Sequence, residues 1–290
     1  MSDTPALKVS YFPGCSLATS AAESNQSLME TCRVVGLELE ELPDWNCCGS
    51  SSAHSLDPDL ALGLAARNLA QAPPDRPLMV MCPACYKNLR RAHLHLVADP
   101  ERRRFEERRW GGEISPELKI ITFLDILAFL DRLRHMGAMR LPPWKNPLKG
   151  LKVAPYFGCA TMFPKAERPP RYDPGLMQRI LRAMGAEVLT WAFPHRCCGT
   201  FLSVIRPDVT TPLVNQIMAA AKAVGADCLV TACAMCQLNL EIRCDLDQPI
   251  PILHFSEAMA LALGARDYEG WFKRHLVDPR PMLRQRRLIA

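Results

Sequence analysis

Hydrophobic and polar positions along the chain alternate between two periods, and the order of these periods in the first half recurs in the second. Short apolar runs indicate strands, and stretches with apolar residues every three or four positions indicate helices. The first half predicts strands at residues 7–12, 37–42 and 78–81 and helices at 22–35 and 58–72. The second half predicts strands at 151–157, 187–191 and 228–231 and helices at 175–184 and 207–224. A last strand and helix close each half, starting near Lys119 and Pro251.

Strands that alternate with helices predict parallel strand pairing, because each crossover returns the chain to the same end of the sheet. We therefore expect an α/β fold of two pseudo-symmetric repeats, each a short parallel sheet with flanking helices. In such sheets the loops that carry chemistry gather at the carboxyl ends of the strands. Three prolines and a glycine disfavour regular structure in residues 141–150. The predicted organisation is a first domain at 1–140, a proline-rich linker at 141–150 and a second domain at 151–290.

Composition narrows the class of protein. With 290 residues, 49% hydrophobic and 22% charged, the chain has the make-up of an ordinary globular protein rather than a disordered one. A net charge of +5 and 7% aromatic residues give no reason to expect nucleic-acid binding. The longest apolar stretch, residues 120–133, is too short and too charged for a membrane span. The amino terminus shows no signal-peptide pattern, so we expect a cytoplasmic protein.

The cysteines show the repeat most clearly. In each half a single cysteine is followed by a vicinal pair and then by a C-x2-C pair, with intervals of 31, 33 and 2 residues in the first half and 37, 34 and 2 in the second. A glycine follows the vicinal pair in both halves. The ten repeated cysteines are Cys15, Cys47, Cys48, Cys82, Cys85, Cys159, Cys197, Cys198, Cys233 and Cys236. In a cytoplasmic protein such clusters are metal ligands or redox groups more often than disulfides.

Five cysteines per half exceed the four ligands of a structural zinc ion or a cubane iron-sulfur cluster. Vicinal cysteines point their sulfur atoms in different directions and suit a cluster with widely separated irons. Gly49 and Gly199 would let the backbone approach such a cluster. A thioredoxin-like dithiol at C-x2-C, zinc in one or both halves, and inert buried thiols remain alternatives.

Residues that do not recur between the halves are weaker candidates. Cys32 and Cys228 have no counterpart and are expected in the core, whereas Cys244 is undecided between core and surface. His195 lies two residues before Cys197 and is our candidate catalytic residue, as a donor of a proton or hydrogen bond; a plain loop histidine is the alternative. His254 lies at a helix start, where capping is its expected role.

The duplicated pattern, Cys-Cys-Gly included, resembles the cysteine-rich CCG domains found in the B-type subunits of the heterodisulfide reductase family over residues 7–264. The resemblance implies that the ten repeated cysteines bind two noncubane [4Fe-4S] clusters, one in each half, with a disulfide reduced between them. Two clusters suit this reaction because disulfide cleavage takes two electrons and each cluster supplies one. Cys233-Ala-Met-Cys236 lacks the proline usual in this motif, and residues 200–203 are bulkier than expected.

Within this family, the arginine-rich and alanine-rich composition favours the sulfur-oxidising bacterial branch, which implies a sulfur substrate on a lipoate-binding protein. The alternative function is an electron-transfer iron-sulfur subunit of a glycolate- or lactate-oxidising or quinone-linked complex, with no disulfide substrate. The chain has no C-x2-C-x2-C run and no flavin or nucleotide motif. We therefore expect two partners that resemble other components of these complexes, a ferredoxin-like iron-sulfur subunit (C type) and a flavin subunit (A type).

Overall fold

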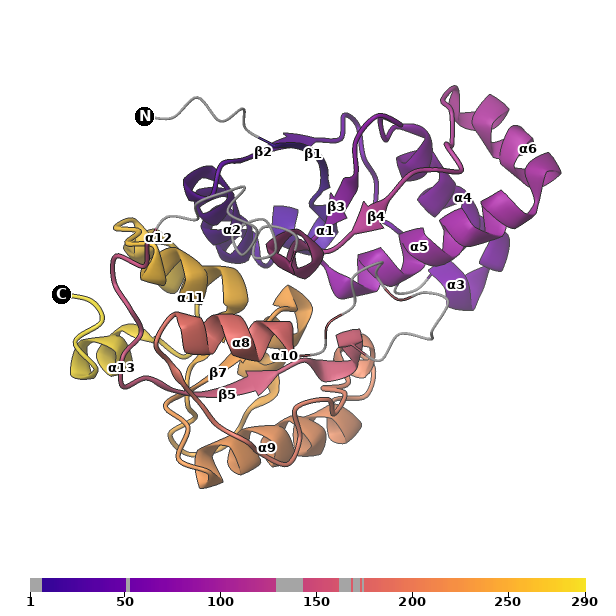
Figure 1. Cartoon of the computed structure of the whole chain (residues 1–290). Coiled ribbons are helices and arrows are strands. Elements are labelled where there is room, and N and C mark those ends of the chain that lie inside the picture. Colours follow the sequence, from indigo (N-terminus) through magenta and orange to yellow (C-terminus); the bar gives the residue numbers. More distant parts are fainter. Residues whose placement is uncertain (1–6, 51–52, 129–142, 162–167, 169–172, 174) are drawn as a thin grey trace. The chain divides into compact units, whose positions relative to one another are not determined.

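A computed structural model describes residues 7–50, 53–128, 143–161, 168, 173 and 175–290. Two four-stranded parallel sheets follow one another along the chain, as Figure 1 shows by label and colour. The first repeat contains β1 (Leu7–Phe12), α1 (Gly14–Ala18), α2 (Ala22–Val34), β2 (Leu37–Glu41), α3 (Ala53–Leu56), α4 (Pro58–Ala70), β3 (Leu78–Val80), α5 (Pro83–Ala98), α6 (Pro100–Trp110) and β4 (Ile120–Ile121). The second contains β5 (Lys152–Tyr156), η1 (Gly158–Thr161), α8 (Leu176–Ala183), β6 (Glu187–Val188), η3 (Thr200–Leu202), α9 (Pro207–Ala223), β7 (Cys228–Thr231), α10 (Ala234–Arg243), β8 (Ile252–His254), α11 (Phe255–Ala262), α12 (Tyr268–Phe272) and α13 (Arg280–Gln285).

The two sheets have the same topology, which confirms the predicted α/β fold of two repeats. The strand order is β2-β1-β3-β4 in the first sheet and β6-β5-β7-β8 in the second, and every pair is parallel. The middle strands β3 and β7 are buried throughout, as expected for strands covered by helices on both faces. Gly36, after α2, and Gly185, after α8, have φ of 78° and 93°, the left-handed conformation of a helix C-cap.

Strand β6 is three residues shorter than the sequence predicts. The sequence predicts a strand at 187–191, but β6 ends at Val188. Leu189 N still donates to Val153 O at 2.9 Å, and the next donor on β5 would be Pro155, which has no N–H. The indole of Trp191 instead donates to Pro155 O at 2.9 Å, so the chain leaves the sheet there.

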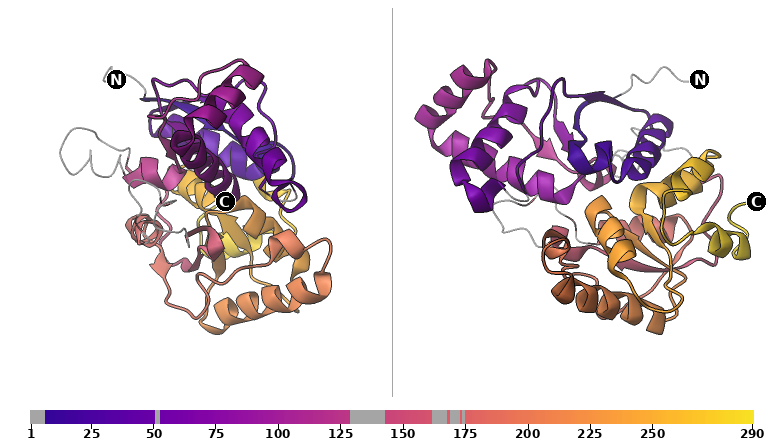
Figure 2. Two further views of the ribbon diagram at one scale, coloured as in Figure 1. Left: turned by 90° about the vertical axis from the view of Figure 1, so that its right-hand side faces the viewer. Right: turned by 180° about the vertical axis from the view of Figure 1, so that it is seen from behind.

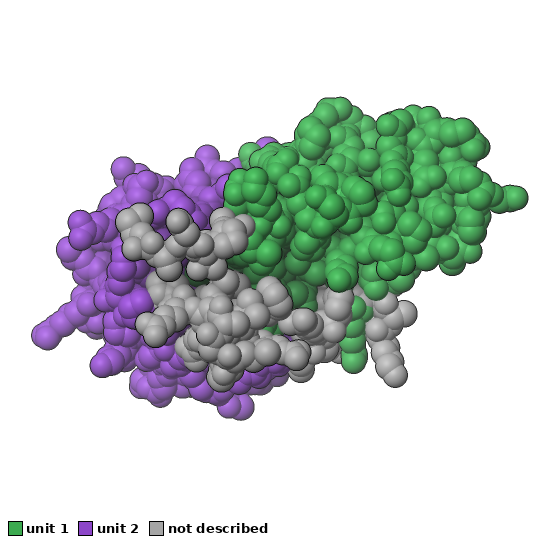
Figure 3. Space-filling model, turned by 45° about the horizontal axis from the view of Figure 1, so that its top comes forward, with its two compact units in different colours: residues 1–18, 35–139, 163–172 green, residues 19–34, 140–162, 173–290 purple. Residues whose placement is uncertain are grey.

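The chain divides into two compact units, coloured separately in Figure 3. Unit 1 comprises residues 1–18, 35–139 and 163–172, and unit 2 comprises residues 19–34, 140–162 and 173–290. Helix α2 of the first repeat therefore belongs to unit 2, where it packs against α11 and α12 (Figure 1 and Figure 2). The expected boundaries 1–140, 141–150 and 151–290 describe the sequence repeat and stay a prediction. Residues 141–142 lie outside the described residues, and residues 143–150 contain neither helix nor strand.

The unrepeated cysteines lie where their sequence context predicts. Cys32 and Cys228 are fully buried core residues, which confirms that expectation. Burial raises the pKa of Cys32 to about 12 and also raises that of Cys228, so both stay neutral thiols. Cys244 is half-buried at the end of α10.

Over the described ranges, none of the helices combines the length and apolar character that crossing a membrane requires.

Candidate metal centres

The ten repeated cysteines lie at or just beyond the carboxyl ends of strands, five in each unit. Cys15 and Cys159 lie in the short helical turns that follow β1 and β5. The vicinal pairs lie in the loops after β2 and β6. The C-x2-C pairs start at the N-caps of α5 and α10, directly after β3 and β7. The parallel topology therefore gathers each set at one sheet edge.

In unit 1, hydrogen bonds between the side chains connect all five cysteines. Cys48 Sγ lies 3.1 Å from Cys85 Sγ. Cys47 is hydrogen-bonded to Cys15 and Cys48, and Cys85 to Cys82. We call this group the first cysteine site.

Unit 2 repeats the arrangement as the second cysteine site. Cys198 Sγ lies 3.6 Å from Cys236 Sγ, the counterpart of the Cys48–Cys85 contact. Cys159 is hydrogen-bonded to Cys197, and Cys233 to Cys236. The structure thus brings together each set of five that the sequence singles out.

The first cysteine of each vicinal pair is acidified at both sites, whereas the second differs, because the pKa of Cys48 is raised by a hydrogen bond with Cys47 and that of Cys198 is lowered by one with Cys236. A hydrogen bond from Cys15 lowers the pKa of Cys47 to about 2, and one from Cys159 lowers the pKa of Cys197 to about 6. The backbone N–H of Gly49 lies 3.5 Å from Cys47 Sγ, and that of Gly199 lies 3.4 Å from Cys197 Sγ. Each site therefore holds an exposed cysteine that readily ionises to the thiolate, and the thiolate is the form of cysteine that binds metal.

Glycines bring the backbone close to the sulfur atoms. A Cβ on Gly14 would lie 3.1 Å from Cys85 Sγ, and one on Gly158 would lie 3.3 Å from Cys236 Sγ. Both glycines have positive φ, 71° and 57°, which side-chain-bearing residues rarely adopt. This close approach and five soft sulfur donors suit an iron-sulfur cluster at each site.

Two asparagines that the cysteine pattern did not single out hold the vicinal cysteines in place. The side-chain amide of Asn88 donates to the carbonyl of Cys48, and Asn239 Nδ2 donates to the carbonyl of Cys198 at 2.8 Å. Both asparagines are buried, and each follows the last cysteine of its set by three residues. The signal was present in the sequence as C-x2-C-x2-N in both halves.

The two histidines singled out in the sequence have different surroundings. The exposed ring of His195 stacks on Phe157 with centroids 5.1 Å apart, and its catalytic role stays a prediction. His254 is the N-cap of α11: its side chain accepts from Ser256 N, and Glu257 reaches back to the His254 N–H at 2.7 Å. The expected capping role of His254 is confirmed.

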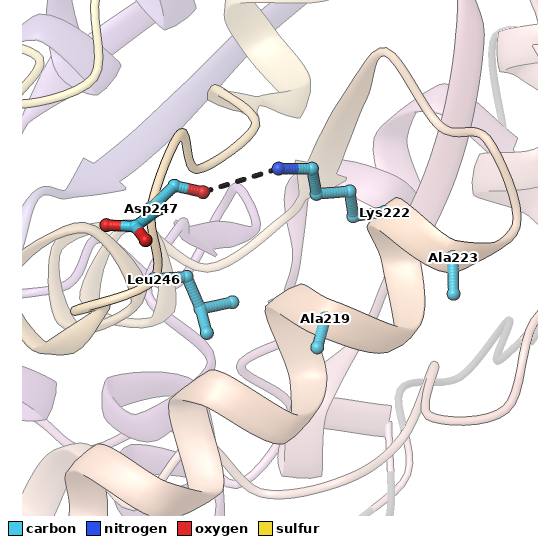
Figure 4. Close-up of a pocket in the computed structure, with 5 residues that line it drawn as sticks. All are labelled: Ala219, Lys222, Ala223, Leu246 and Asp247. Carbon is cyan, nitrogen blue, oxygen red and sulfur yellow. Dashed lines mark hydrogen bonds between the residues drawn. The ribbon is translucent and has the colours of Figure 1, made fainter.

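Within the described ranges, no three His, Cys, Asp or Glu side chains are arranged to hold a single metal ion. A shallow pocket of about 330 Å³ lies against α9 in unit 2 and contains no cysteine (Figure 4). Its one ammonium group, Lys222 Nζ, donates to the carbonyls of Asp247 and Gln248 at 3.3 and 2.9 Å. The pocket takes no part in either cysteine site.

Comparison with known proteins agrees with the repeat. The family model of the cysteine-rich domain CCG matches residues 9–90 and 153–241. The chain is 30% identical to the 8-methylmenaquinol:fumarate reductase membrane anchor subunit of Wolinella succinogenes, over 92% of this chain and 96% of that protein. It is 27% identical to the B-type subunit of the ferredoxin/F420H2-dependent CoB-CoM heterodisulfide reductase of Methanosarcina acetivorans, over 89% of each chain.

More distant relatives include a probable glycolate oxidase iron-sulfur subunit of Bacillus subtilis, 22% identical over 89% of this chain and 55% of that protein. Among solved structures, a hypothetical protein from Helicobacter pylori matches with a TM-score of 0.73 at 12% identity. The match covers 95% of this chain and 53% of that one, so the chain spans about half the length of that protein. This likeness concerns the fold alone.

Proposed function

Because this chain belongs to the family of the cysteine-rich CCG domain, we propose that it is an iron-sulfur subunit of a heterodisulfide reductase-like oxidoreductase complex. The observation that carries the proposal is the duplicated site: two sets of five cysteines, each gathered at the carboxyl edge of a parallel sheet. Relatives named as B-type subunits of heterodisulfide reductases, or as similar to them, match most of the chain at 25–27% identity, which supports the same assignment.

Each cysteine site would hold one [4Fe-4S] cluster of the noncubane type through its own five cysteines. Five sulfur donors, one more than a cubane uses, support this geometry. Cys47 and Cys197, the readily ionised thiols, would bind as thiolates without a base to remove their protons. Asn88 and Asn239 would hold the vicinal pairs in place through the carbonyls they bind.

The proposed reaction is the reversible reduction of a disulfide by two electrons and two protons to two thiols. When bound, each cluster supplies one electron to the disulfide, or accepts one when thiols are oxidised. In this chain, the glycines beside the sulfur atoms leave room for close approach, and His195 is the proposed proton or hydrogen-bond donor beside Cys197. In the sulfur-oxidising direction, we propose a sulfur substrate carried on a lipoate-binding protein.

Electrons would enter or leave singly through a ferredoxin-like iron-sulfur subunit, which would exchange them in turn with a flavin subunit. All thirteen cysteines are free thiols, and the ten proposed ligands leave only Cys32, Cys228 and Cys244, which is too few for a further four-cysteine cluster. Free thiols also fit a reducing compartment, so we propose the cytoplasm as the place of action.

A second candidate function is electron conduction with no disulfide substrate. It is favoured by the relatives named as subunits of a fumarate reductase and of a glycolate oxidase, whose named reactions involve no disulfide. In this case both sites would pass electrons between partner proteins and would not react with thiols.

EPR spectroscopy of the anaerobically purified chain, oxidised with and without a thiol, separates the candidates. Disulfide chemistry predicts a paramagnetic signal that changes when the thiol is added. Iron present with no thiol response would favour electron conduction. Zinc in place of iron would contradict both.

A further inference from the structure

A buried histidine lies between two buried carboxylates in unit 2. His275 Nδ1 is 2.9 Å from Glu241 Oε1 on α10, and His275 Nε2 is 2.9 Å from Glu257 Oε1 on α11. The three side chains are between 0 and 4% exposed. Leu276 N also donates to the second oxygen of Glu241 at 2.8 Å, so the segment after α12 is fastened to α10. We call the three residues the Glu-His-Glu clamp.

The clamp binds a proton tightly. Burial by itself lowers the pKa of His275, but the charge of Glu257 and the hydrogen bonds that the ring donates to both carboxylates outweigh it and raise the pKa to about 10. At neutral pH the ring is therefore an imidazolium, and it compensates one of the two buried negative charges. The other titratable groups that act on the clamp are Glu23 on α2, its partner Arg274, and His254. Burial lowers the pKa of His254 to about 4, so His254 is neutral and adds no charge.

Two connections lead from the clamp to the second cysteine site. Gln237 directly follows Cys236, and its side-chain nitrogen packs 3.2 Å from His275 Nε2, a contact and not a hydrogen bond while the ring is protonated. Glu257 accepts from the His254 N–H at the end of β8. His254 is paired across the sheet with Thr231, whose hydroxyl accepts from Cys233 N at 3.2 Å. The clamp thus lies behind both cysteines of the C-x2-C pair.

The part of the first repeat that the structure describes contains no such clamp. Counted from the last cysteine of each set, Gln237 corresponds to Tyr86 and Glu241 to Arg90. Only Glu257 has an acidic counterpart, Asp125, whose carboxylate accepts from the Thr122 N–H and hydroxyl. The clamp is therefore a feature in which the two sites differ.

We propose that His275 is a positioning residue for the second cysteine site: bridging Glu241 and Glu257, it holds α10 behind Cys236 and sets the buried charge there. The proposal rests on the proposed function, because it takes the second cysteine site to be an iron-sulfur site. On this proposal, an electrostatic difference between the two sites comes from the Glu-His-Glu clamp, whose residues are not among the ten cysteines.

The test is a redox titration of the EPR signals in the full anaerobically purified chain and its variants. Signals are assigned with the double variant Cys47→Ser, Cys48→Ser, which removes the vicinal pair of the first site. His275→Gln leaves buried negative charge uncompensated, so the midpoint potential of the second site should become more negative. Glu241→Gln removes a negative charge, so the midpoint potential of the second site should become more positive in this variant. The first-site potential should not move in either variant.

Opposite shifts of the second-site potential distinguish this role from a merely structural one, since simple loosening of the fold would shift that potential in the same direction in both variants. His93→Gln, which removes a buried histidine from unit 1, should leave the second-site potential unchanged. If His275→Gln does not fold, Glu241→Gln and Glu257→Gln carry the test, each with a positive shift expected. Unchanged second-site potentials, or shifts of the same sign in His275→Gln and Glu241→Gln, would overturn the proposal.

Failure of the proposed function has a different outcome. A wild-type chain purified anaerobically without iron would contradict the proposed function, and the role of His275 toward a cluster would fall with it. An iron-loaded wild type whose second-site potential ignores all three variants would contradict only the role of His275.

Discussion

Single residues at the two sites do the same work in both repeats. Gly14 and Gly158 pass the backbone close to a cysteine sulfur, and Asn88 and Asn239 bind the carbonyl of the second vicinal cysteine. Each of these contacts lies within a single unit. Loss of one contact should therefore affect the cysteine site of that unit and leave the other site intact.

Gly14→Ala should lower the iron content of the first site, because the added methyl group would lie 3.1 Å from Cys85 Sγ. Gly36→Ala is the matched control: Gly36 also has a positive φ, but nothing lies within 4 Å of an added Cβ. Both variants carry backbone strain of about 1 kcal/mol. Iron analysis with urea unfolding measures the two effects, and equal iron loss in both variants would show that strain alone is responsible.

Asn239→Ala should destabilise unit 2 by about 1–3 kcal/mol, because the buried carbonyl of Cys198 loses its donor. Asn215→Ala, at an exposed hydrogen bond to Asp245, should cost less than about 0.5 kcal/mol. Urea unfolding of the iron-free chain measures both. A smaller effect at Asn239 than at Asn215 would contradict the assigned role.

The Glu-His-Glu clamp makes a pH-dependent contribution to stability. The pKa of His275 rises from its ordinary 6.5 to about 10 on folding, so its stabilising effect is complete below pH 6.5 and disappears as the pH rises through 10. His275→Gln should cost about 3–5 kcal/mol near pH 6 and progressively less towards pH 10. Unfolding free energies of the iron-free variant and wild type, measured across this pH range, should therefore converge. A difference that grows with pH would contradict the clamp.

At the scale of elements, the placement of α2 is the main departure from the repeat. Its contact face carries Ser24, Ser27 and Thr31, and all three are buried. Ser27 Oγ lies 2.7 Å from Ser256 Oγ on α11, and Ser24 Oγ donates to Gln237 on α10 at 3.3 Å. Buried hydrogen bonds therefore help to join this helix to unit 2.

Ser256→Ala should loosen α2 together with α11, because Ser256 Oγ bonds to Ser24, Ser27 and His254. Native-state hydrogen exchange should show faster exchange of α2 amides along with unit 2, and unchanged protection of β1 and β3 in unit 1. Faster exchange of α2 without α11 would contradict the assignment of α2 to unit 2.

The sequence predicts the elements well because their signals are local. The run 228–231 and the helix signal at 58–72 are periodic enough to place β7 and α4 within two residues. The sequence does not predict that α2 belongs to unit 2, because a helix face of serine and threonine has the hydrophobicity pattern of a solvent-exposed face. A local pattern does not reveal the early end of β6, because that end depends on Pro155 in a neighbouring strand. Nor does it reveal the Glu-His-Glu clamp, because His275 lies 18 positions from Glu257 and 34 positions from Glu241.

At the scale of the whole molecule, the chain is a duplicated structure whose two sites are alike in their cysteines, glycines and asparagines. They differ in the surroundings of the C-x2-C pair, where unit 2 has the clamp and the described residues of unit 1 form none. The ten cysteines were evident from the repeat, because ligand spacing is preserved in sequence. Each site draws all five cysteines from within one unit, in agreement with the family resemblance, which implies one cluster in each half.

The most direct test of this account is iron and acid-labile sulfide per chain after anaerobic purification. We expect about eight irons in the wild type, as two four-iron clusters require. The double variants Cys47→Ser, Cys48→Ser and Cys197→Ser, Cys198→Ser should each retain about four, because each unit builds its site from its own cysteines. Loss of all iron in either double variant, or zinc in place of iron in the wild type, would contradict the account.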